Sequence, residues 1–180
     1  MHLDEKTLDS KEIYKGTVVH LFNDTVLLEN GRKAGRDVIK HPGGVCVVAL
    51  TDENEVLMVK QFRYPHHRVT TEIPAGKLEW GESHLECGKR ELLEETGFVS
   101  DSFDYLGCLL PTPAYDTEII HMYLARGLHY EKQKLDEGEF LDVERIPLDK
   151  AVEMIMNNQL QDAKTQIAIM KAKLLLSEQK

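Results

Sequence analysis

The segment from Ser83 to Gly97 constrains the fold of this chain more strongly than any other part of the sequence. Ser83 and Glu86 form the pattern of a capping box, in which a hydroxyl and a carboxylate satisfy free amides at the start of a helix. Gly97 is typical of the residue that follows the last helical turn, because glycine adopts the left-handed conformation without strain. The sequence therefore predicts one helix over residues 83–96.

Three glutamates occupy the second half of this predicted helix. Glu91, Glu94 and Glu95 are spaced i, i+3 and i+4, which places their carboxylates on one helical face. Like charges at this spacing destabilise a helix, and these also lie near the negative end of its dipole. A hard divalent cation such as Mg²⁺ or Mn²⁺ prefers oxygen ligands and would compensate them. Taken alone, such a pattern is more often an ordinary solvated acidic face.

The residues around the glutamates make a longer pattern, GKLEWGESHLECGKRELLEETGF, which runs from Gly76 to Phe98. Its fixed positions are Gly76, Glu82, Arg90, Glu91, Leu92, Glu94, Glu95, Gly97 and Phe98. All of them match the Nudix signature, so the chain resembles the Nudix hydrolases. The resemblance implies metal-assisted hydrolysis of a diphosphate, with Glu94 in the catalytic group. The implied metal ligands are the Ala75 carbonyl, Glu91, Glu94 and Glu95.

Three further residues of this pattern have an expected structural role. Gly76 lets the backbone approach a metal or a phosphate closely, because it has no side chain. Arg90 is expected to pair with Glu82 or with another carboxylate and so to hold the loop in register. These residues support the site without taking part in the chemistry.

The substrate must be argued from residues outside the pattern, since the signature leaves the leaving groups open. Over roughly residues 40–175 the chain is similar to ADP-ribose pyrophosphatases, at Gln61–Tyr64, at Glu72–Gly76 and at Pro113–Glu118. Many members carry glycine after the proline, whereas Ala114 follows Pro113 here. The resemblance implies hydrolysis of ADP-ribose or a similar nucleoside diphosphate sugar. GDP-mannose, another nucleotide sugar, or a nucleotide sensor without catalysis are the alternatives.

Two arginines and one glutamate are candidates for binding the substrate. Arg63 and Arg68 suit phosphate oxygens because the guanidinium fork donates two parallel hydrogen bonds. A surface ion pair is the alternative for Arg63, and a solvent-facing loop is the alternative for Arg68. Glu72 is expected to bond a ribose hydroxyl or to join the metal shell, and an ordinary strand end is its alternative. Pro113 completes the predicted substrate contacts by resemblance.

The acidic segment at residues 131–139 is predicted to be a mobile loop that supplies the general base. Glu139 is the first choice, because it precedes the Phe140–Val143 strand as the loop glutamate does in this family. Glu137 is the second choice. The alternative is a charged loop with no role in catalysis.

Composition limits the partners and the compartment. The net charge of −9 argues against binding to nucleic acid, which needs an excess of Lys and Arg. Cys46, Cys87 and Cys108 form no CxxC pair, which favours a reducing cytoplasm and thiols buried in the core. No apolar run approaches the roughly 18 residues of a membrane span. We therefore expect a cytoplasmic protein that binds a small nucleotide sugar and no membrane.

The strand and helix patterns predict an α+β fold. Apolar runs at residues 45–50 and 56–59 flank polar residues and suggest a hairpin, and a turn is expected at Asn23–Asp24. Strands dominate the first two thirds and helices the end, at residues 148–157 and 163–176. The resemblance implies the Nudix fold, a mixed β-sheet sandwiched between α-helices (α/β/α).

The predicted domain organisation is a small N-terminal antiparallel β-sheet at residues 1–40 and a Nudix hydrolase domain at residues 41–180. Related pyrophosphatases are dimers that share substrate pockets across the interface. By that resemblance alone, the chain is expected to be a homodimer whose N-terminal strands are exchanged between subunits.

Overall fold

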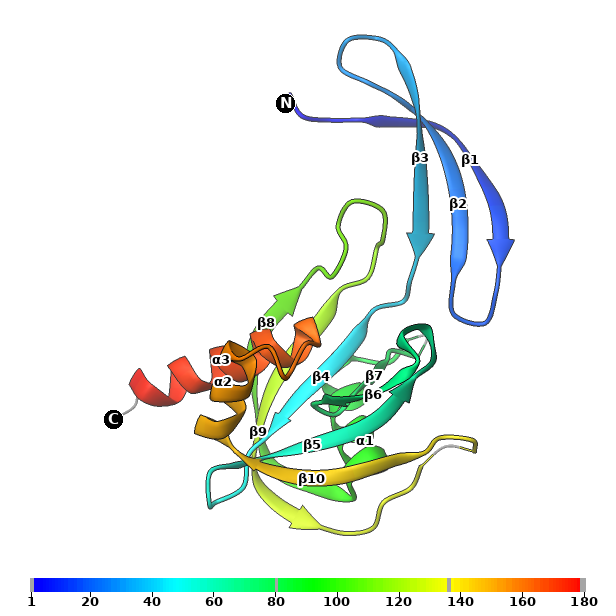
Figure 1. Ribbon diagram of the computed structural model, residues 1–180. Coiled ribbons are helices and arrows are strands. Elements are labelled where there is room, and N and C mark those ends of the chain that lie inside the picture. The colour runs from blue at the N-terminus through cyan, green and yellow to red at the C-terminus, as the bar shows by residue number, and fades with distance from the viewer. Residues whose placement is uncertain (1, 80, 136, 179–180) are drawn as a thin grey trace. The chain divides into compact units, whose positions relative to one another are not determined.

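A computed structural model describes residues 2–79, 81–135 and 137–178 of the 180-residue chain (Figure 1). It forms two compact units, Met1–Gly43 with Leu110–Ile119, and Gly44–Leu109 with Ile120–Lys180. In chain order the elements are β1 (Lys6–Lys15), β2 (His20–Leu27), β3 (Lys33–Lys40), β4 (Gly44–Ala49), β5 (Glu55–Arg63), the 3₁₀ turn η1 (Tyr64–His66), β6 (Arg68–Glu72), β7 (Ala75–Lys77), α1 (His84–Thr96), β8 (Phe98–Leu109), β9 (Ile120–Tyr130), β10 (Leu141–Pro147), α2 (Leu148–Met156) and α3 (Ala163–Glu178).

The first unit contains a three-stranded antiparallel sheet in the order β1-β2-β3. The turn between β1 and β2 is closed where Gly16 N–H donates to the Val19 carbonyl at 2.9 Å. The turn expected at Asn23–Asp24 is wrong, because both residues lie inside β2. The Asn23 amide donates across the sheet to Asp37 Oδ1 at 2.9 Å, so a residue typical of turns is satisfied within a strand.

The loop 110–119 belongs to the same unit through backbone hydrogen bonds to the end of β3. Ile39 N–H donates to the Tyr115 carbonyl at 2.7 Å, and Thr117 N–H donates to the Ile39 carbonyl at 3.0 Å. Pro113 lies in this loop and is exposed. The loop therefore has a defined conformation next to β3.

The second unit is built on two sheets, in the orders β7-β4-β9-β8 and β10-β5-β6. In the first sheet β4 runs parallel to β9 and antiparallel to β7, so this sheet is mixed. The predicted hairpin of residues 45–50 and 56–59 is wrong, because β4 and β5 belong to different sheets. A single bridge, Leu50 with Val56, joins them. β4 takes its ladder partners from β7 and β9, and β5 takes its ladder partners from β6 and β10.

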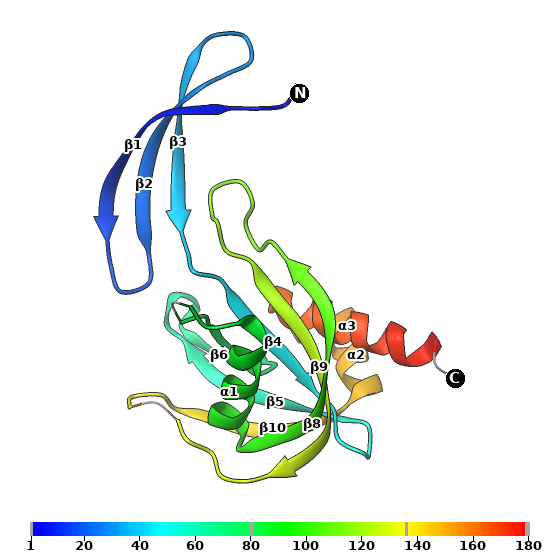
Figure 2. The ribbon, with the colours of Figure 1, turned by 180° about the vertical axis from the view of Figure 1, so that it is seen from behind.

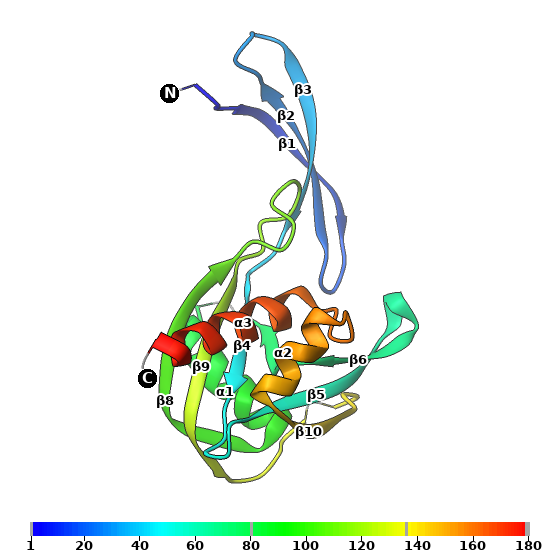
Figure 3. The ribbon, with the colours of Figure 1, turned by 60° about the vertical axis from the view of Figure 1, so that its left-hand side comes forward.

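Helices cover both faces of this mixed sheet, and the side chains of β4 show how. Val45, Val47 and Ala49 pack in one apolar cluster with Cys87 and Leu92 of α1. The alternate side chains of β4, which are those of Cys46 and Val48, pack on the other face with α3 residues. Figures 2 and 3 show α1 on one side of the sheet and α2 and α3 on the other. The predicted α+β sandwich is confirmed.

The residues predicted to begin and end α1 have the expected capping geometry. Ser83 Oγ accepts a hydrogen bond from Glu86 N–H at 3.2 Å, and Gly97 follows the helix with φ of +78°.

Two of the three thiols are buried, those of Cys46 and Cys87, but Cys108 is exposed, which corrects the expectation of three core thiols. None of the helices in the described ranges is long and apolar enough to cross a membrane.

Candidate active site

The loop that contains β7 passes directly over the acidic face of α1. A β-carbon on Gly76 would lie 1.9 Å from Glu91 Oε1, so a side chain at this position would displace the carboxylate. One residue earlier, Ala75 N–H donates to Glu95 Oε2 at 2.9 Å. The strand backbone and two glutamates of α1 are therefore in contact.

Both of these glutamates are buried carboxylates. Glu91 is 9% exposed and Glu95 is 4% exposed. Burial raises the pKa of Glu95 to about 8, with help from the charges of Glu91 and Glu139 and against the Ala75 hydrogen bond. Burial also raises the pKa of Glu91 to about 7, against the opposing effect of Arg90. The charged forms of both carboxylates are therefore disfavoured in the protein alone.

Arg90 is the cation that the protein itself provides. Its Nε donates to Glu82 Oε1 at 2.9 Å, and its Nη1 donates to Glu91 Oε1 at 2.6 Å and to Glu94 Oε2 at 2.9 Å. The Arg90 hydrogen bond lowers the pKa of Glu82 to about 2. Glu82 Oε2 also accepts from Glu79 N–H at 3.0 Å, which fixes the loop before α1. Arg90 and Glu82 thus connect the loop to the acidic helix face.

The donor set at this face suits a hard divalent cation, because the carboxylates and the nearby Ala75 carbonyl offer oxygen only. In the described ranges, no three Asp, Glu, His or Cys side chains already surround one metal position. Instead Arg90 Nη1 bonds both Glu91 and Glu94. Burial, the main cause of the raised pKa values of Glu91 and Glu95, disfavours their charged forms, and a bound cation would offset that penalty.

The two candidate base residues differ in their position. Glu139 is half-buried, and its Oε1 accepts a hydrogen bond from Gln61 Nε2 of β5 at 3.5 Å. Its charge raises the pKa of both Glu91 and Glu95, which places its carboxylate close to theirs. Glu137 is exposed at the turn of the same loop. The structure therefore brings Glu139, and not Glu137, to the acidic cluster.

Arg63 and Glu72 form a bidentate ion pair at the edge of the second sheet. Arg63 Nε donates to Glu72 Oε1 at 2.8 Å and Nη2 donates to Oε2 at 2.7 Å. Glu72 is 3% exposed and accepts further hydrogen bonds from Thr70 Oγ1 and Lys164 Nζ. The Glu72 carboxylate is thus engaged inside the protein rather than open to a ribose hydroxyl or a metal.

These residues line a pocket of about 490 Å³ between β6, η1 and the start of α3. Arg68, which is exposed, also lines it and donates from Nη2 to Gln161 Oε1 at 2.5 Å. The sequence had indicated neither Gln161 nor Lys164 as a site residue. Both lie more than ninety positions from their partners in the chain, so no local pattern could have identified them.

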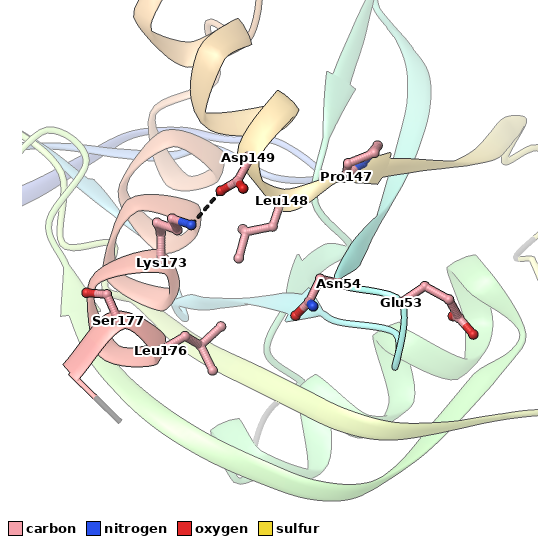
Figure 4. Close-up of a pocket in the computed structure, with 8 residues that line it drawn as sticks. All are labelled: Glu53, Asn54, Pro147, Leu148, Asp149, Lys173, Leu176 and Ser177. Carbon is pink, nitrogen blue, oxygen red and sulfur yellow. Dashed lines mark hydrogen bonds and ion pairs between the residues drawn. The ribbon is translucent and has the colours of Figure 1, made fainter. Parts of the chain in front are cut away.

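A second pocket, of about 420 Å³, lies at the turn between β4 and β5 and is shown in Figure 4. Leu148 and Asp149 at the start of α2 line it, together with Lys173 of α3, which pairs with Asp149. None of the predicted site residues lines this pocket. This pocket shares no lining residue with the acidic cluster.

Comparisons with known proteins agree on one family. The family model of the NUDIX domain matches residues 40–168. An ADP-ribose pyrophosphatase of Bacillus subtilis (strain 168) is 42% identical over 169 residues, which cover 93% of this chain and 91% of that protein. A methanol dehydrogenase activator of Bacillus methanolicus is also 42% identical, over 92% of this chain and 91% of that protein.

A GDP-mannose pyrophosphatase of Yersinia enterocolitica is more distant, with 30% identity over 82% of this chain and 83% of that protein. Among solved structures, the crystal structure of an ADP compounds hydrolase matches with a TM-score of 0.88 and 20% identity. That match covers 99% of this chain and 97% of the other. It shows that the chain has the same fold.

Proposed function

This chain belongs to the NUDIX family, and we propose that it hydrolyses the diphosphate of ADP-ribose or of a similar nucleoside diphosphate sugar. The products are a nucleoside monophosphate and a sugar phosphate. The observation that carries the proposal is the pair of buried carboxylates, Glu91 and Glu95, packed against the segment of Ala75 and Gly76. The similarity to an ADP-ribose pyrophosphatase supports the choice of substrate.

Each of the candidate site residues has a proposed role in the reaction. The glutamates of α1 and the Ala75 carbonyl would hold a divalent ion, Mg²⁺ or alternatively Mn²⁺, which would neutralise the diphosphate and activate water. Glu139 would accept the proton of the attacking water, because its carboxylate acts on both Glu91 and Glu95. Arg63 contacts a phosphate oxygen, and Arg68 contributes positive charge at the rim of the same pocket. Arg90 and Glu82 hold the loop.

The test is a substrate panel incubated with the protein and Mg²⁺. The panel contains ADP-ribose, GDP-mannose, a dinucleoside polyphosphate and a nucleoside triphosphate, and the released phosphomonoester is measured with a phosphatase. We expect ADP-ribose to be hydrolysed fastest. Glu95→Gln should abolish turnover, whereas Glu86→Gln, on the exposed face of the same helix, should not. If the wild-type protein hydrolyses nothing on the panel, the enzyme proposal is wrong and a nucleotide sensor becomes the better explanation.

The panel also decides between the two nucleotide sugars. GDP-mannose remains the alternative substrate, supported by the relative that carries that activity in its name. The metal site is common to both, so the difference must come from groups that contact the base and the sugar. Faster turnover of GDP-mannose than of ADP-ribose would overturn our choice.

A second candidate function is activation of an alcohol dehydrogenase. It is favoured by one observation, the relative named methanol dehydrogenase activator, which is as similar as the pyrophosphatase. The test measures the rate of a methanol dehydrogenase with and without this protein. Comparison with Glu95→Gln then shows whether any activation requires the hydrolytic site.

We further propose a cytoplasmic homodimer in which residues 1–40 are exchanged between subunits and residues 41–180 form the hydrolase domain, with neither nucleic acid nor membrane as a partner. The sheet β1-β2-β3 supports a second copy as the partner, because it exposes large apolar side chains. These are Leu8, Ile13 and Tyr14 of β1 and, in the turn that follows it, Val18 and Val19. Light scattering after size-exclusion chromatography should give twice the mass of one chain.

A further inference from the structure

The first turn of α3 is attached to the strand that leads into the metal loop. Asp162 Oδ2 accepts a hydrogen bond from Thr165 N–H at 2.9 Å and so caps the helix. The Thr165 hydroxyl, which is fully buried, accepts a hydrogen bond from Ile73 N–H at 3.0 Å. Two residues further along the chain, Ala75 bonds Glu95. The start of α3 therefore fixes the backbone just before the acidic cluster.

Lys164 extends this attachment from the backbone to the side chain of Glu72. Its Nζ donates to Glu72 Oε2 at 2.5 Å and lies 3.0 Å from Asp162 Oδ1. The Lys164 side chain is only 13% exposed. Burial alone would lower its pKa, but Asp162 and Glu72 raise it, so the ammonium stays charged. Lys164 is a buried cation held by two carboxylates.

The Glu72 carboxylate is therefore shared by two cations. Arg63 takes both oxygens with Nε and Nη2, while Thr70 bonds Oε1 and Lys164 bonds Oε2. Four hydrogen bonds to two oxygens leave Glu72 little freedom to rotate. Because Arg63 is bound to this carboxylate on one edge of its fork, the orientation of Glu72 sets the orientation of the guanidinium.

The opposite edge of the Arg63 guanidinium is available for a ligand. Within the described part of the chain Nη1 makes no hydrogen bond, and the side chain is 40% exposed at the pocket. Arg63 and Glu95 are close enough for each charge to shift the pKa of the other group. Arg63 is thus near Glu95, and the free edge of its guanidinium is open at the pocket.

We propose that Lys164 is a positioning residue for the reaction, because it shares Glu72 with Arg63 and thereby holds the free edge of the Arg63 fork toward the phosphate. Lys164 does not touch the substrate; it acts through Glu72. This inference rests on the proposed hydrolysis of a nucleoside diphosphate sugar. It assigns a role in substrate binding to α3, which lies outside the signature segment.

The test compares the steady-state kinetics of ADP-ribose hydrolysis in Mg²⁺ for wild type, Lys164→Met and Lys164→Arg. Loss of a charged hydrogen-bond partner should raise KM about tenfold in Lys164→Met, with kcat within about twofold, since Arg63 binds ground state and transition state alike. Lys164→Arg keeps the charge and should return KM to within about threefold of wild type. Lys150→Met, which removes an exposed lysine of α2, should leave both parameters unchanged.

A double-mutant cycle separates positioning from a general structural effect. If Lys164 acts through Arg63, then Lys164→Met should raise KM no further in an Arg63→Ala background. An equal rise in both backgrounds, or an unchanged KM in Lys164→Met alone, would overturn the proposal. Absence of ADP-ribose hydrolysis by the wild-type protein would instead remove the proposed function and this role with it, so the two failures are distinguishable. All assays are run well below the thermal midpoint of each variant.

Discussion

Gly76 and Glu91 approach each other so closely that a β-carbon on residue 76 would overlap the carboxylate, at 1.9 Å from Oε1 and 2.0 Å from Cδ. The obstructed atoms belong to the end of a flexible side chain. A substitution at this position is therefore accommodated by movement of the Glu91 carboxylate. It should disturb the geometry of the site more than the stability of the fold.

We expect Gly76→Ala to lower kcat/KM about 100-fold, because displacing a catalytic group by about 1 Å is enough for a loss of that size. The thermal midpoint should change by no more than a few degrees. Gly35→Ala is the matched control, since a β-carbon there has its nearest neighbour at 4.0 Å. A fall of more than 10 °C in the midpoint of Gly76→Ala would show instead that the strand, and not Glu91, gives way.

Glu95→Gln should separate chemistry from stability. The pKa of Glu95 is raised to about 8, so without metal the carboxyl is largely protonated at neutral pH and resembles an amide. Gln can still accept the hydrogen bond from Ala75 N–H. We therefore expect a thermal midpoint within about 2 °C of wild type, and a loss of at least about 100-fold in kcat because one metal ligand is missing. Differential scanning calorimetry and the ADP-ribose assay provide the two measurements.

The parts of the fold that could be predicted are those with local signals. Ser83 and Gly97 define the ends of α1 by their own chemistry, and both ends were correct to within a residue. The hairpin of β4 and β5 was wrong for the opposite reason. The sequence of a short apolar strand does not indicate which strand it pairs with. In the structure β4 pairs with β9, more than seventy residues later.

The candidate site, like the fold, has one part that local sequence patterns predict and another part that they do not predict. The glutamates of α1 share a face because helical geometry requires it, so their proximity follows from spacing alone. Lys164 has no such pattern: its partner Glu72 is 92 residues away, and a buried lysine between two carboxylates is visible only after folding. Glu72 was expected to bind the ligand, yet its oxygens accept hydrogen bonds from three side chains of the protein. The sequence shows that a carboxylate stands at residue 72, but it does not show which groups form hydrogen bonds with that carboxylate.

The contribution of His121 to stability should depend on pH, because its imidazole lies in a stacked pair on the second unit. His84 and His121 stack with ring centroids 4.0 Å apart, and each Nδ1 is hydrogen-bonded to a tyrosine, Tyr123 and Tyr105 respectively. Burial, and then the charge of His84, lowers the pKa of His121 below its ordinary 6.5. The folded state therefore binds fewer protons at His121 than the unfolded state, so the contribution of His121 to the free energy of unfolding should decrease as pH falls below about 6.5. The raised pKa values of Glu91 and Glu95 act in the opposite direction, so the contribution of His121 is measured by comparison with a variant.

Urea denaturation at pH 7.5, 6.5 and 5.5 measures this dependence. In His121→Phe the ring stacking is retained but the titrating group is lost, so the free energy of unfolding should rise relative to wild type as pH falls from 6.5 to 5.5. His129→Phe is the control, because His129 is exposed and pairs with Asp101. Equal slopes for His121→Phe and wild type would contradict the prediction.

The three thiols should differ in reactivity. Cys108 is exposed, whereas burial of Cys46 and Cys87 raises the pKa of each thiol to about 12. An aromatic disulfide reagent should therefore modify one thiol per chain rapidly in the native protein and all three after unfolding in guanidinium. Cys108→Ser should remove the rapid phase. A rapid phase that persists in this variant would show that the segment around a buried thiol opens readily.

Glu137 and Glu139 of the 131–139 loop should have unequal effects on the rate. Glu139 is half-buried and interacts with Glu91 and Glu95, whereas Glu137 is exposed. If Glu139 is the general base, Glu139→Gln should lower kcat by about 10²- to 10⁴-fold, with little change in KM, and Glu137→Gln should stay within about twofold of wild type. The pH profile adds a second readout, because loss of the base should flatten the rise of kcat with pH. The reverse ranking of the two variants would assign the base to Glu137, and equal small effects would leave activation of water to the metal alone.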